Sequence, residues 1–509
     1  MKKIQLLFTL SALHMSFSTL AASEESTKET PLASKAPNIV FILSDDMGKQ
    51  DLSIFGSELY ETPNIDGLAK DGMRFDNAYS AHPRCVPSRI SMLSGQDSAR
   101  NGNPIIKRKH KLPPKVVTFA EHLQQSGYKT GYIGKWHLGK KDGGWPEHQG
   151  FDENMLAGSA GLPDSYFYPW GAKTKNGQAT FGHIKANKGD YITDRLASEA
   201  EGFIDRHQNQ PFLLVLSHYS VHTPIQAKDQ EAKYYHDKLT KMGIEPSTAT
   251  HMPDLKQGKN GISEYKTQQN NPRYAAMVGS VDKSVGRVLA KLKDLNLEDN
   301  TVVIFTSDHG GLSSRGPNKR ELGTSNLPYR QGKGWLYDGG LRVPLIVKWP
   351  GKIAKNSTSL TQVTGTDHYP TILQLANLPL SPEDHIDGLS YLEALEGKKV
   401  TRPAFFFHSP LGRPGSTGDT NASAIIDGDW KLIDWFDEDR IELFNLKDDL
   451  AEQNDVALKY SEKTKALKDK LDNWLKETNA QYRKPGKKAK WDLPENGKEV
   501  SNKTGKFQW

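Results

Sequence analysis

Four polar clusters in this sequence contain residue types that bind metal ions, hold anions or transfer protons. They are Asp45-Asp46, Lys135 with His137, His222, and Asp308-His309. Carboxylates from two separate segments can supply several hard oxygen ligands to one divalent cation. An isolated pair of aspartates, however, more often forms a turn or caps a helix. The carboxylates therefore indicate a metal site only if the fold brings the clusters together.

Each cluster follows a short, mostly apolar run, which is typical of a strand buried on both faces of a parallel sheet. The runs cover residues 38–43, 129–133, 211–216 and 301–305, and a further predicted strand covers 342–347. In open α/β sheets, ligands gather beyond the carboxyl ends of the strands. Because the clusters lie at those ends, we expect them to converge at one edge of the sheet.

Helical patterns fill the gaps between these strands. From residue 274 to 295, apolar residues recur every three to four positions, as in an amphipathic helix. Strands that alternate with such helices predict an α/β fold, in which helices sandwich a large, mostly parallel sheet.

The sequence changes character near residue 403. Three short strand-like pieces, 404–407, 430–433 and 442–444, precede one amphipathic helix. The apolar stripe of that helix consists of Tyr460, Leu467, Leu471, Trp474 and Leu475. We therefore expect an N-terminal domain over 38–402, a smaller α+β subdomain with a short antiparallel sheet over 403–483, and a Lys-rich extension over 484–509.

Composition and the N-terminus bound the class of protein. The chain has 509 residues, 36% of them hydrophobic, which is enough for a large core. A net charge of +6 is mild, so we expect no nucleic-acid partner. Lys2 and Lys3 precede an apolar stretch that ends in small residues, which predicts a signal peptide over 1–21 and a flexible lead-in over 22–37. We expect an exported protein, periplasmic or secreted, without a membrane anchor.

The chain contains one cysteine, Cys85, which excludes an intramolecular disulfide and a cysteine-based zinc or iron–sulfur site. A lone cysteine is most often a small buried apolar residue. Its surroundings, C85-V-P-S-R followed by M92-L-S-G, favour another interpretation. This segment resembles the signature of type I sulfatases, a family of the alkaline phosphatase superfamily whose cysteine is oxidised to Cα-formylglycine.

The other positions of the family pattern are present in order. The resemblance implies that Asp45, Asp46, Cys85 as formylglycine, Asp308 and His309 bind one Ca²⁺. It also implies that the catalytic residues are Cys85, Arg89, Lys135, His137, His222 and Lys333. The chain departs from the usual pattern at Gln96, where the family has Arg, and at His309, where many members have Asn.

The resemblance implies an alkaline-phosphatase-like catalytic domain over 38–402 and an enzyme that hydrolyses sulfate monoesters. One hydroxyl of a formylglycine hydrate would attack sulfur, with Asp308 as the expected base, and a maturation enzyme would form the formylglycine. The segment G-K333-G-W-L-Y-D-G-G-L-R-V-P looks like that of bacterial carbohydrate sulfatases. A sulfated oligo- or polysaccharide, of algal or glycosaminoglycan type, is therefore the expected substrate. The alternatives are a phosphonate monoester or phosphodiester hydrolase and a non-catalytic protein that binds sulfated glycans.

Two further groups of residues have weaker signals. We expect a structural role for His82 and His408, although either could line a substrate cleft. The aromatic residues Trp145, Tyr166, Tyr168 and Trp170 are expected to pack in the core rather than stack on sugar rings.

Overall fold

The structure is a computed structural model that describes residues 36–102, 112–139, 144–158, 161–170 and 184–482. The predicted signal peptide over 1–21 and the predicted extension over 484–509 lie outside the described residues, as does the lead-in up to residue 35. No helix within the described ranges is long and apolar enough to cross a membrane.

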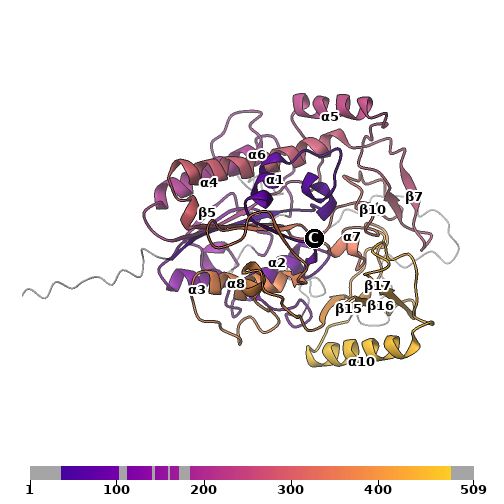
Figure 1. Ribbon diagram of the computed structural model, residues 1–509. Coiled ribbons are helices and arrows are strands. Elements are labelled where there is room, and N and C mark those ends of the chain that lie inside the picture. Colours follow the sequence, from indigo (N-terminus) through magenta and orange to yellow (C-terminus); the bar gives the residue numbers. More distant parts are fainter. Residues whose placement is uncertain (1–35, 103–111, 140–143, 159–160, 171–183, 483–509) are drawn as a thin grey trace, which may run out of the picture.

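A large mixed sheet forms the centre of the molecule (Figure 1). Its strand order is β12-β2-β11-β9-β1-β6-β4-β5. The bounds are β1 Asn38–Ser44, β2 Met73–Phe75, β4 Lys129–Gly134, β5 Glu153–Met155, β6 Phe212–Ser217, β9 Thr301–Ser307, β11 Leu345–Lys348 and β12 Ser357–Ser359. Strands β9, β1, β6, β4 and β5 run parallel, whereas β11 is antiparallel to β9 and to β2. The predicted mostly parallel sheet is confirmed.

Strand β11 is shorter than the predicted 342–347. Arg342 caps the short helix α7 (Asp338–Leu341), and its backbone N–H donates to the Asp338 carbonyl at 2.7 Å. Pro344 has no N–H to donate to a neighbouring strand, so regular pairing starts at Leu345. The apolar run alone could not reveal this cap.

Helices cover both faces of the central sheet (Figure 1). One layer contains α1 Pro63–Lys70, α4 Ile192–His207, α5 Asp229–Lys241 and α6 Pro272–Asp294, and the other contains α2 Cys85–Ser94, α3 Phe119–Gln125, α8 His368–Leu375 and α9 Leu392–Leu395. Within β1, Val40 and Ile42 belong to the first core, whereas Phe41 and Leu43 belong to the second. Because side chains alternate between two buried faces, a central strand must be apolar at nearly every position.

A four-stranded antiparallel sheet and helix α10 (Ser461–Glu477) form the C-terminal part. The strands are β14 Phe405–Ser409, β15 Ala422–Asp427, β16 Trp430–Trp435 and β17 Arg440–Asn445. One face of this sheet packs on α10 through Leu467, Leu471, Trp474 and Leu475. Strand β15 was missing from the sequence prediction, because its small residues Ala422 and Ser423 gave a weak strand signal. The placement of Tyr460 in the apolar stripe was wrong, since Tyr460 precedes the helix as its N-cap and is 41% exposed.

Two smaller sheets complete the fold. Strands β7 (Leu255–Gln257), β8 (Glu264–Lys266) and β10 (Ser314–Arg315) form a three-stranded antiparallel sheet. Strand β3 (Ala78–Tyr79) pairs in parallel with β13 (Val363–Thr364).

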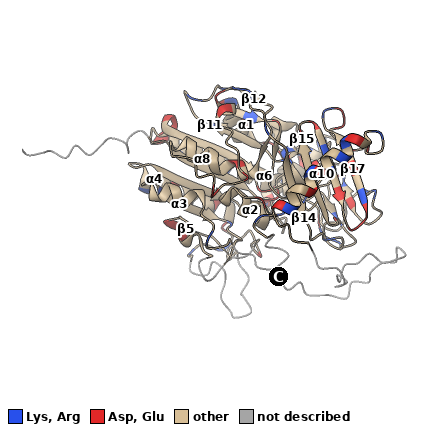
Figure 2. Ribbon diagram, turned by 90° about the horizontal axis from the view of Figure 1, so that it is seen from below, with Lys and Arg blue, Asp and Glu red and all other residues tan. Residues whose placement is uncertain are grey.

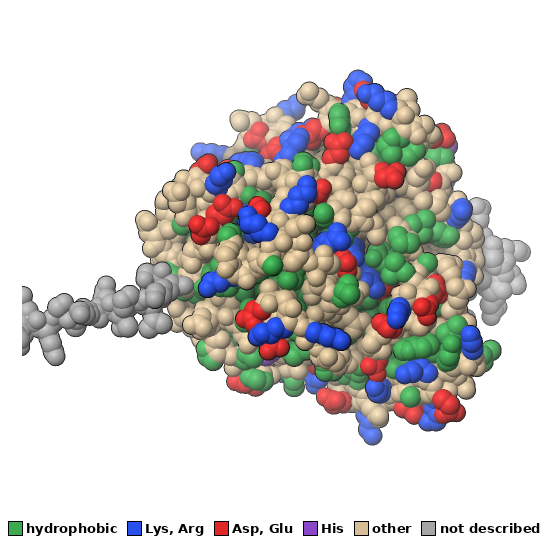
Figure 3. Space-filling view, in the orientation of Figure 1, with side chains coloured by type: hydrophobic (Ala, Val, Ile, Leu, Met, Phe, Trp, Pro, Cys, Tyr) green, Lys and Arg blue, Asp and Glu red, His purple; other side chains and the backbone are tan. Residues whose placement is uncertain are grey.

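The charged residues lie mainly at the periphery. Charged positions of both signs mark α10 and β17 at the outer end of the ribbon in Figure 2. On the face drawn in Figure 3, Lys and Arg side chains are interspersed with Asp and Glu. Mixed signs on this face agree with the mild net charge of +6.

Candidate active site

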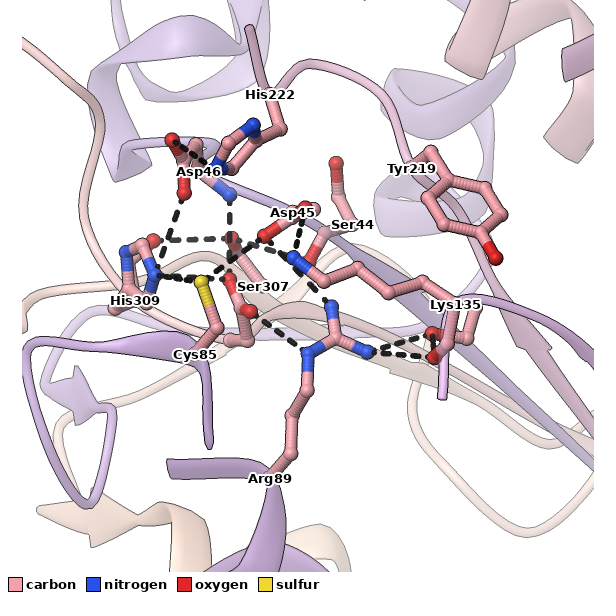
Figure 4. Close-up of polar contacts among 12 residues, drawn as sticks. Ser44, Asp45, Asp46, Cys85, Arg89, Lys135, Tyr219, His222, Ser307 and His309 are labelled. Atoms are coloured by element: carbon pink, nitrogen blue, oxygen red, sulfur yellow. Dashed lines mark hydrogen bonds and ion pairs between the residues drawn. The ribbon is translucent and has the colours of Figure 1, made fainter. Parts of the chain in front are cut away.

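The predicted clusters meet beyond the carboxyl ends of the central strands (Figure 4). Backbone hydrogen bonds continue past the strand ends and hold them together: the Asp308 N–H donates to the Ser44 carbonyl at 3.1 Å, and the Lys135 N–H donates to the Ser217 carbonyl at 2.8 Å. The Asp45 N–H donates to the Ser220 carbonyl at 3.0 Å. The parallel register therefore carries the side chains of the predicted clusters to a common edge, as predicted.

Asp45, Asp46, Cys85 and His309 form a buried cluster that has the donor atoms of a metal site. One ligand atom from each residue lies within 4.8 Å of those of the others. His309 Nε2 lies 3.2 Å from Cys85 Sγ and 3.3 Å from Asp46 Oδ1. Asp308 borders the cluster, with Oδ1 at 3.6 Å from His309 Nε2. Converging carboxylate oxygens fit a hard divalent cation such as Ca²⁺.

Two lysines bring positive charge into the same space. Lys333 Nζ donates to both oxygens of Asp46, at 2.6 and 2.9 Å, and lies 3.6 Å from Cys85 Sγ. Lys135 Nζ, which is fully buried, donates to Asp45 Oδ2. Burial alone would raise the pKa of Asp46, but His222, Lys333 and His309 outweigh it and hold this pKa far below its ordinary value. The Asp46 carboxyl group is thus ionised at neutral pH.

Cys85 is the first residue of helix α2, so its sulfur lies at the positive end of the helix dipole. Burial by itself raises the pKa of the Cys85 thiol. The charges of Lys135, Lys333 and His309, together with a hydrogen bond to His137, hold that pKa well below its ordinary value. The position therefore stabilises a negatively charged group at residue 85.

Arg89 lies one helical turn after Cys85, on the same face of α2. Its Nε donates to Asp308 Oδ2 at 2.9 Å, and its Nη1 donates to Ser217 Oγ at 2.7 Å and to the Lys135 carbonyl at 3.1 Å. These contacts tie α2 to the ends of β4, β6 and β9. Arg89 therefore fixes the positions of Asp308, Ser217 and the Lys135 backbone relative to α2.

Two histidines flank the cluster. His222 Nδ1 donates to the Thr223 carbonyl at 2.7 Å, which leaves Nε2 facing Asp46 at 3.8 Å. Burial lowers the pKa of His222 to about 3 and that of His137 to about 4. His137 packs against Gly161, where a Cβ atom would lie 2.4 Å from the imidazole ring. The absence of a side chain at Gly161 is thus required for the position of His137.

Glycines bring Lys333 to the site. The Lys333 N–H donates to the Gly311 carbonyl at 3.0 Å, and the Gly310 N–H donates to the Gly340 carbonyl at 3.0 Å. A Cβ atom on Gly310 would lie 1.9 Å from the Gly339 carbonyl oxygen. The loop after β9 and the segment that carries Lys333 can approach this closely only because both are rich in glycine.

All ten residues predicted for the site therefore lie together, and their roles in catalysis stay predictions. Sequence reasoning missed Ser217 and Ser307. Ser217 Oγ accepts a hydrogen bond from Arg89, and Ser307 Oγ accepts one from the Met47 backbone N–H. Their signal was available, since each is the polar residue that ends an apolar strand. Tyr166 and Trp170 are fully buried, which confirms the expectation of core packing for these two aromatic residues.

The fold and the site together define an α/β protein in which a buried cysteine lies among carboxylates, a histidine and lysines at the carboxyl ends of the central strands. Comparison with family models matches residues 37–378 to the sulfatase family, and residues 331–481 to the C-terminal region of N-sulphoglucosamine sulphohydrolase. The chain belongs to the sulfatase family.

Its relatives include sulfatases from animals and bacteria. The chain is 31% identical to the N-acetylgalactosamine-6-sulfatase of Canis lupus familiaris over 79% of this chain and 72% of that protein. It is 26% identical to the N-acetylgalactosamine-6-O-sulfatase of Bacteroides thetaiotaomicron, over 88% and 94% respectively. The crystal structure of Ps i-CgsB in complex with k-i-k-neocarrahexaose matches with a TM-score of 0.70 at 29% identity, over 86% of this chain and 93% of that chain.

Proposed function

We propose that this protein is an exported sulfatase that hydrolyses sulfate monoesters on a sulfated carbohydrate of algal or glycosaminoglycan type and releases inorganic sulfate. The observation that carries the proposal is the position of Cys85. Its sulfur lies 3.2 Å from His309 Nε2 and 3.6 Å from Lys333 Nζ, at the N-terminus of α2. Residue 85 thus lies where a nucleophile would meet both a metal ion and an anion.

Two groups complete the proposed site. Asp45, Asp46, Asp308 and His309 would hold one Ca²⁺, and a maturation enzyme would convert Cys85 to formylglycine. The donor set fits this assignment, because oxygen ligands predominate and the fifth ligand would be an oxygen of the modified residue. Formylglycine in its hydrated form supplies a hydroxyl nucleophile, and Ca²⁺ supplies positive charge beside it.

The remaining residues bind and orient the sulfate group. Lys135 and Lys333 would donate hydrogen bonds to the sulfuryl oxygens, since both ammonium groups already lie beside residue 85. Arg89 would fix the orientation of Asp308, the expected base. Each contact places positive charge where negative charge accumulates in the transition state.

The histidines are assigned to proton transfer. His222 would deliver a proton from Nε2 to the departing sugar oxygen. Because Nδ1 keeps its own proton for the Thr223 carbonyl, this step requires the imidazolium form, which the negative charge of a bound sulfate ester would favour. His137 hydrogen-bonds residue 85 and would accept a proton from it when the product is released. Removal of a general acid or base typically lowers the rate by about 10²–10⁴-fold.

The substrate class rests on the similarity to carbohydrate sulfatases. An N-acetylgalactosamine-6-sulfatase and a structure with a carrageenan-type oligosaccharide both match most of the chain. We also propose that residues 1–21 are a signal peptide, that 38–402 form the catalytic domain, and that 403–483 form the subdomain.

The proposal is tested by incubating the purified full chain, co-expressed with a formylglycine-generating enzyme, with 6-sulfated N-acetylgalactosamine and with carrageenan oligosaccharides. We expect release of inorganic sulfate from at least one of them. 4-Nitrophenyl sulfate and 4-nitrophenyl phosphate, which share one leaving group, distinguish a sulfatase from a phosphohydrolase. Faster hydrolysis of the phosphate ester would overturn the proposal, and so would binding of the oligosaccharides without turnover.

A further inference from the structure

A second group of basic side chains lies beside the catalytic cluster. It consists of His82, Arg84, Arg320 and Arg413, which we call the basic cluster. The charges of Arg84 and Arg413 act on His82, and those of Arg84 and Arg320 act on Arg413. His82 and Arg84 immediately precede helix α2, Arg320 lies in the loop after β10, and Arg413 lies between β14 and β15. Three separate segments, one of them from the C-terminal part, therefore contribute to one group.

Hydrogen bonds fix these segments against one another. Arg84 Nη2 donates to Asp419 Oδ2, and the Arg413 backbone N–H donates to the same oxygen at 3.3 Å. The Gly316 N–H donates to the Ser416 carbonyl at 2.9 Å, which joins the loop before Arg320 to the loop after Arg413. The segments that carry the basic cluster are thus held together by hydrogen bonds.

Several polar nitrogens of the basic cluster lack a hydrogen-bond partner among the described residues. Arg84 is 3% exposed, and neither its Nε nor its Nη1 has a hydrogen-bond partner among the described residues. His82 is 1% exposed, and neither ring nitrogen has a partner in the described part of the chain. Buried donors without acceptors are rare in proteins and cost stability. A guanidinium group that is held by only one nitrogen still offers a fork for a planar or tetrahedral oxyanion.

The balance of charges in this region also favours an anionic ligand. The Arg84 guanidinium and the Arg413 backbone N–H both contact the Asp419 carboxylate, whose charge also acts on the Arg413 side chain. Burial, together with the positive charge of Arg84, lowers the pKa of Arg413 to about 9. Burial likewise lowers the pKa of Arg320, although Asp46 and Cys85 oppose this effect. The positive charges repel one another, so an added anion would relieve the repulsion.

The basic cluster lies close to the proposed catalytic residues. Arg84 is adjacent in sequence to Cys85, and Arg320 Nη2 donates to Thr223 Oγ1 at 3.0 Å, next to His222. His222 is the residue to which we assigned the proton for the departing sugar oxygen. The basic cluster would therefore border the sugar side of the reacting sulfate, and Arg320 and Arg413 are partly exposed.

We propose that His82, Arg84, Arg320 and Arg413 form a second anion subsite, which holds a carboxylate or a second sulfate group of the same substrate molecule. This inference rests on the proposed sulfatase function and narrows the substrate to a sugar with at least two anionic groups. An oxyanion in this cluster would accept hydrogen bonds from Arg84 and His82, and it would weaken the mutual repulsion of Arg84, Arg320 and Arg413.

The test compares substrates in matched pairs. One pair is a monosulfated disaccharide with a uronate carboxylate and its methyl ester, and the other is a disulfated disaccharide and its monosulfated form. For the protein with native Arg413, we expect kcat/KM to be higher for the doubly charged member of one pair. The pair that gives this preference identifies the second group as a carboxylate or a sulfate.

The variant Arg413→Gln should reduce that preference about 10- to 100-fold, the effect of one charge-assisted hydrogen bond. Arg413→Lys should restore part of it. The matched control is Arg206→Gln, because Arg206 lies in α4 with a half-exposed side chain that pairs with Glu153. We expect the control to keep the full preference. If Arg413→Gln does not fold, as judged by circular dichroism, Arg320→Gln serves as the second variant with the same expectation.

The possible failures are distinguishable. If the protein hydrolyses both members of each pair equally well, the subsite proposal is wrong and the sulfatase proposal stands. If variant and native protein show the same preference, the donors of Arg84 and His82 bind only water, which also contradicts the subsite. If no sulfate ester is hydrolysed at all, the proposed function itself fails.

Discussion

Two buried ionic clusters in this molecule have similar residues and different construction. The junction cluster contains Asp338, Arg342, Lys431 and Glu452, and it joins the segment that carries Lys333 to the C-terminal sheet. Lys431 Nζ lies 2.7 Å from both Asp338 Oδ1 and Glu452 Oε1, and Arg342 Nε lies 2.6 Å from Asp338 Oδ2. Two positive charges thus meet two carboxyl groups, and the protein itself supplies the partners.

The catalytic cluster is organised around a sulfur atom instead. Lys333 and His309 approach Cys85 Sγ as well as Asp46, and Asp45 lies 3.7 Å from the same sulfur. Its charged groups share one small space in which a metal ion and a sulfate group have suitable ligands. The comparison teaches that burial and pairing alone do not identify a functional site. What distinguishes the catalytic cluster is that its groups converge on a reactive atom.

The largest expected effect is on activity and comes from removing the Cys85 sulfur, which only the catalytic cluster contains. Cys85→Ala should lower kcat/KM for sulfate esters by about 10⁴-fold or more, because the nucleophile is lost. The melting temperature should change little, since a small side chain is replaced by a smaller one. Steady-state kinetics and thermal unfolding provide both readouts. An active Cys85→Ala protein would remove the basis for the difference between the clusters.

Metal removal is the next test. Treatment with EDTA should lower kcat/KM by about 10³-fold, because it removes the metal ion. The substitution Asp46→Asn should have a similar effect, because it removes the carboxylate that both Lys333 and His309 approach. Added Ca²⁺ should restore the EDTA-treated protein and raise its melting temperature, but should do neither for Asp46→Asn. Full activity in EDTA would contradict the assignment of a metal site.

The junction cluster should respond in stability rather than in chemistry. Lys431→Met leaves Asp338 and Glu452 buried without their shared cation and should cost about 3–5 kcal/mol of unfolding free energy. The matched control is Lys468→Met in α10, whose partner Asp472 is half exposed; it should cost less than about 1 kcal/mol. Urea unfolding measures both, and equal losses would show that the junction pairing is unimportant.

The stability loss of Lys431→Met should depend on pH. Burial raises the pKa of Glu452, and Lys431 opposes that effect; Lys431 also helps to hold the pKa of Asp338 below its ordinary value. Without Lys431, both folded-state pKa values rise. A carboxyl group with a raised pKa stabilises the fold below its unfolded pKa and loses this contribution as the pH rises through the folded value. The deficit of Lys431→Met should therefore be smallest near pH 4 and grow toward pH 8; a constant deficit would contradict this.

A smaller effect on rate is expected for Lys333→Ala. Loss of one charge-assisted contact to the sulfuryl group should lower kcat/KM by roughly 10²–10³-fold, about 3–4 kcal/mol. Because Asp46 also loses a partner, binding of Ca²⁺ should be measured separately by its effect on the melting temperature. A near-native rate for a good substrate would exclude Lys333 from sulfate binding.

Much of the central fold could be predicted from sequence because its signals are local. Strand β1 needs apolar residues on both faces, and the run 38–43 displays them. The spacing in 274–295 likewise predicted α6 to within two residues. Strand β15 and the start of β11 could not be predicted, because their bounds depend on pairing and on the Arg342 cap.

The site followed the same rule. Asp45, Lys135 and Asp308 follow strand ends, so topology alone was enough to predict that they meet. Arg413 and Lys431 lie far along the chain in a different sheet or its loops, and no motif marks them. Arg413 comes close to the catalytic cluster, and Lys431 comes close to Asp338, only because the C-terminal sheet packs against the N-terminal domain. Local sequence patterns do not predict that packing.

The central claim is that residue 85 of the active protein is formylglycine rather than cysteine. The most direct test is mass spectrometry of the proteolytic peptide that contains residue 85, from protein made with the maturation enzyme. Our account predicts a peptide lighter by the difference between H₂S and one oxygen atom, in a proportion that tracks sulfatase activity between preparations. Full activity in a preparation that contains only the unmodified thiol would contradict it.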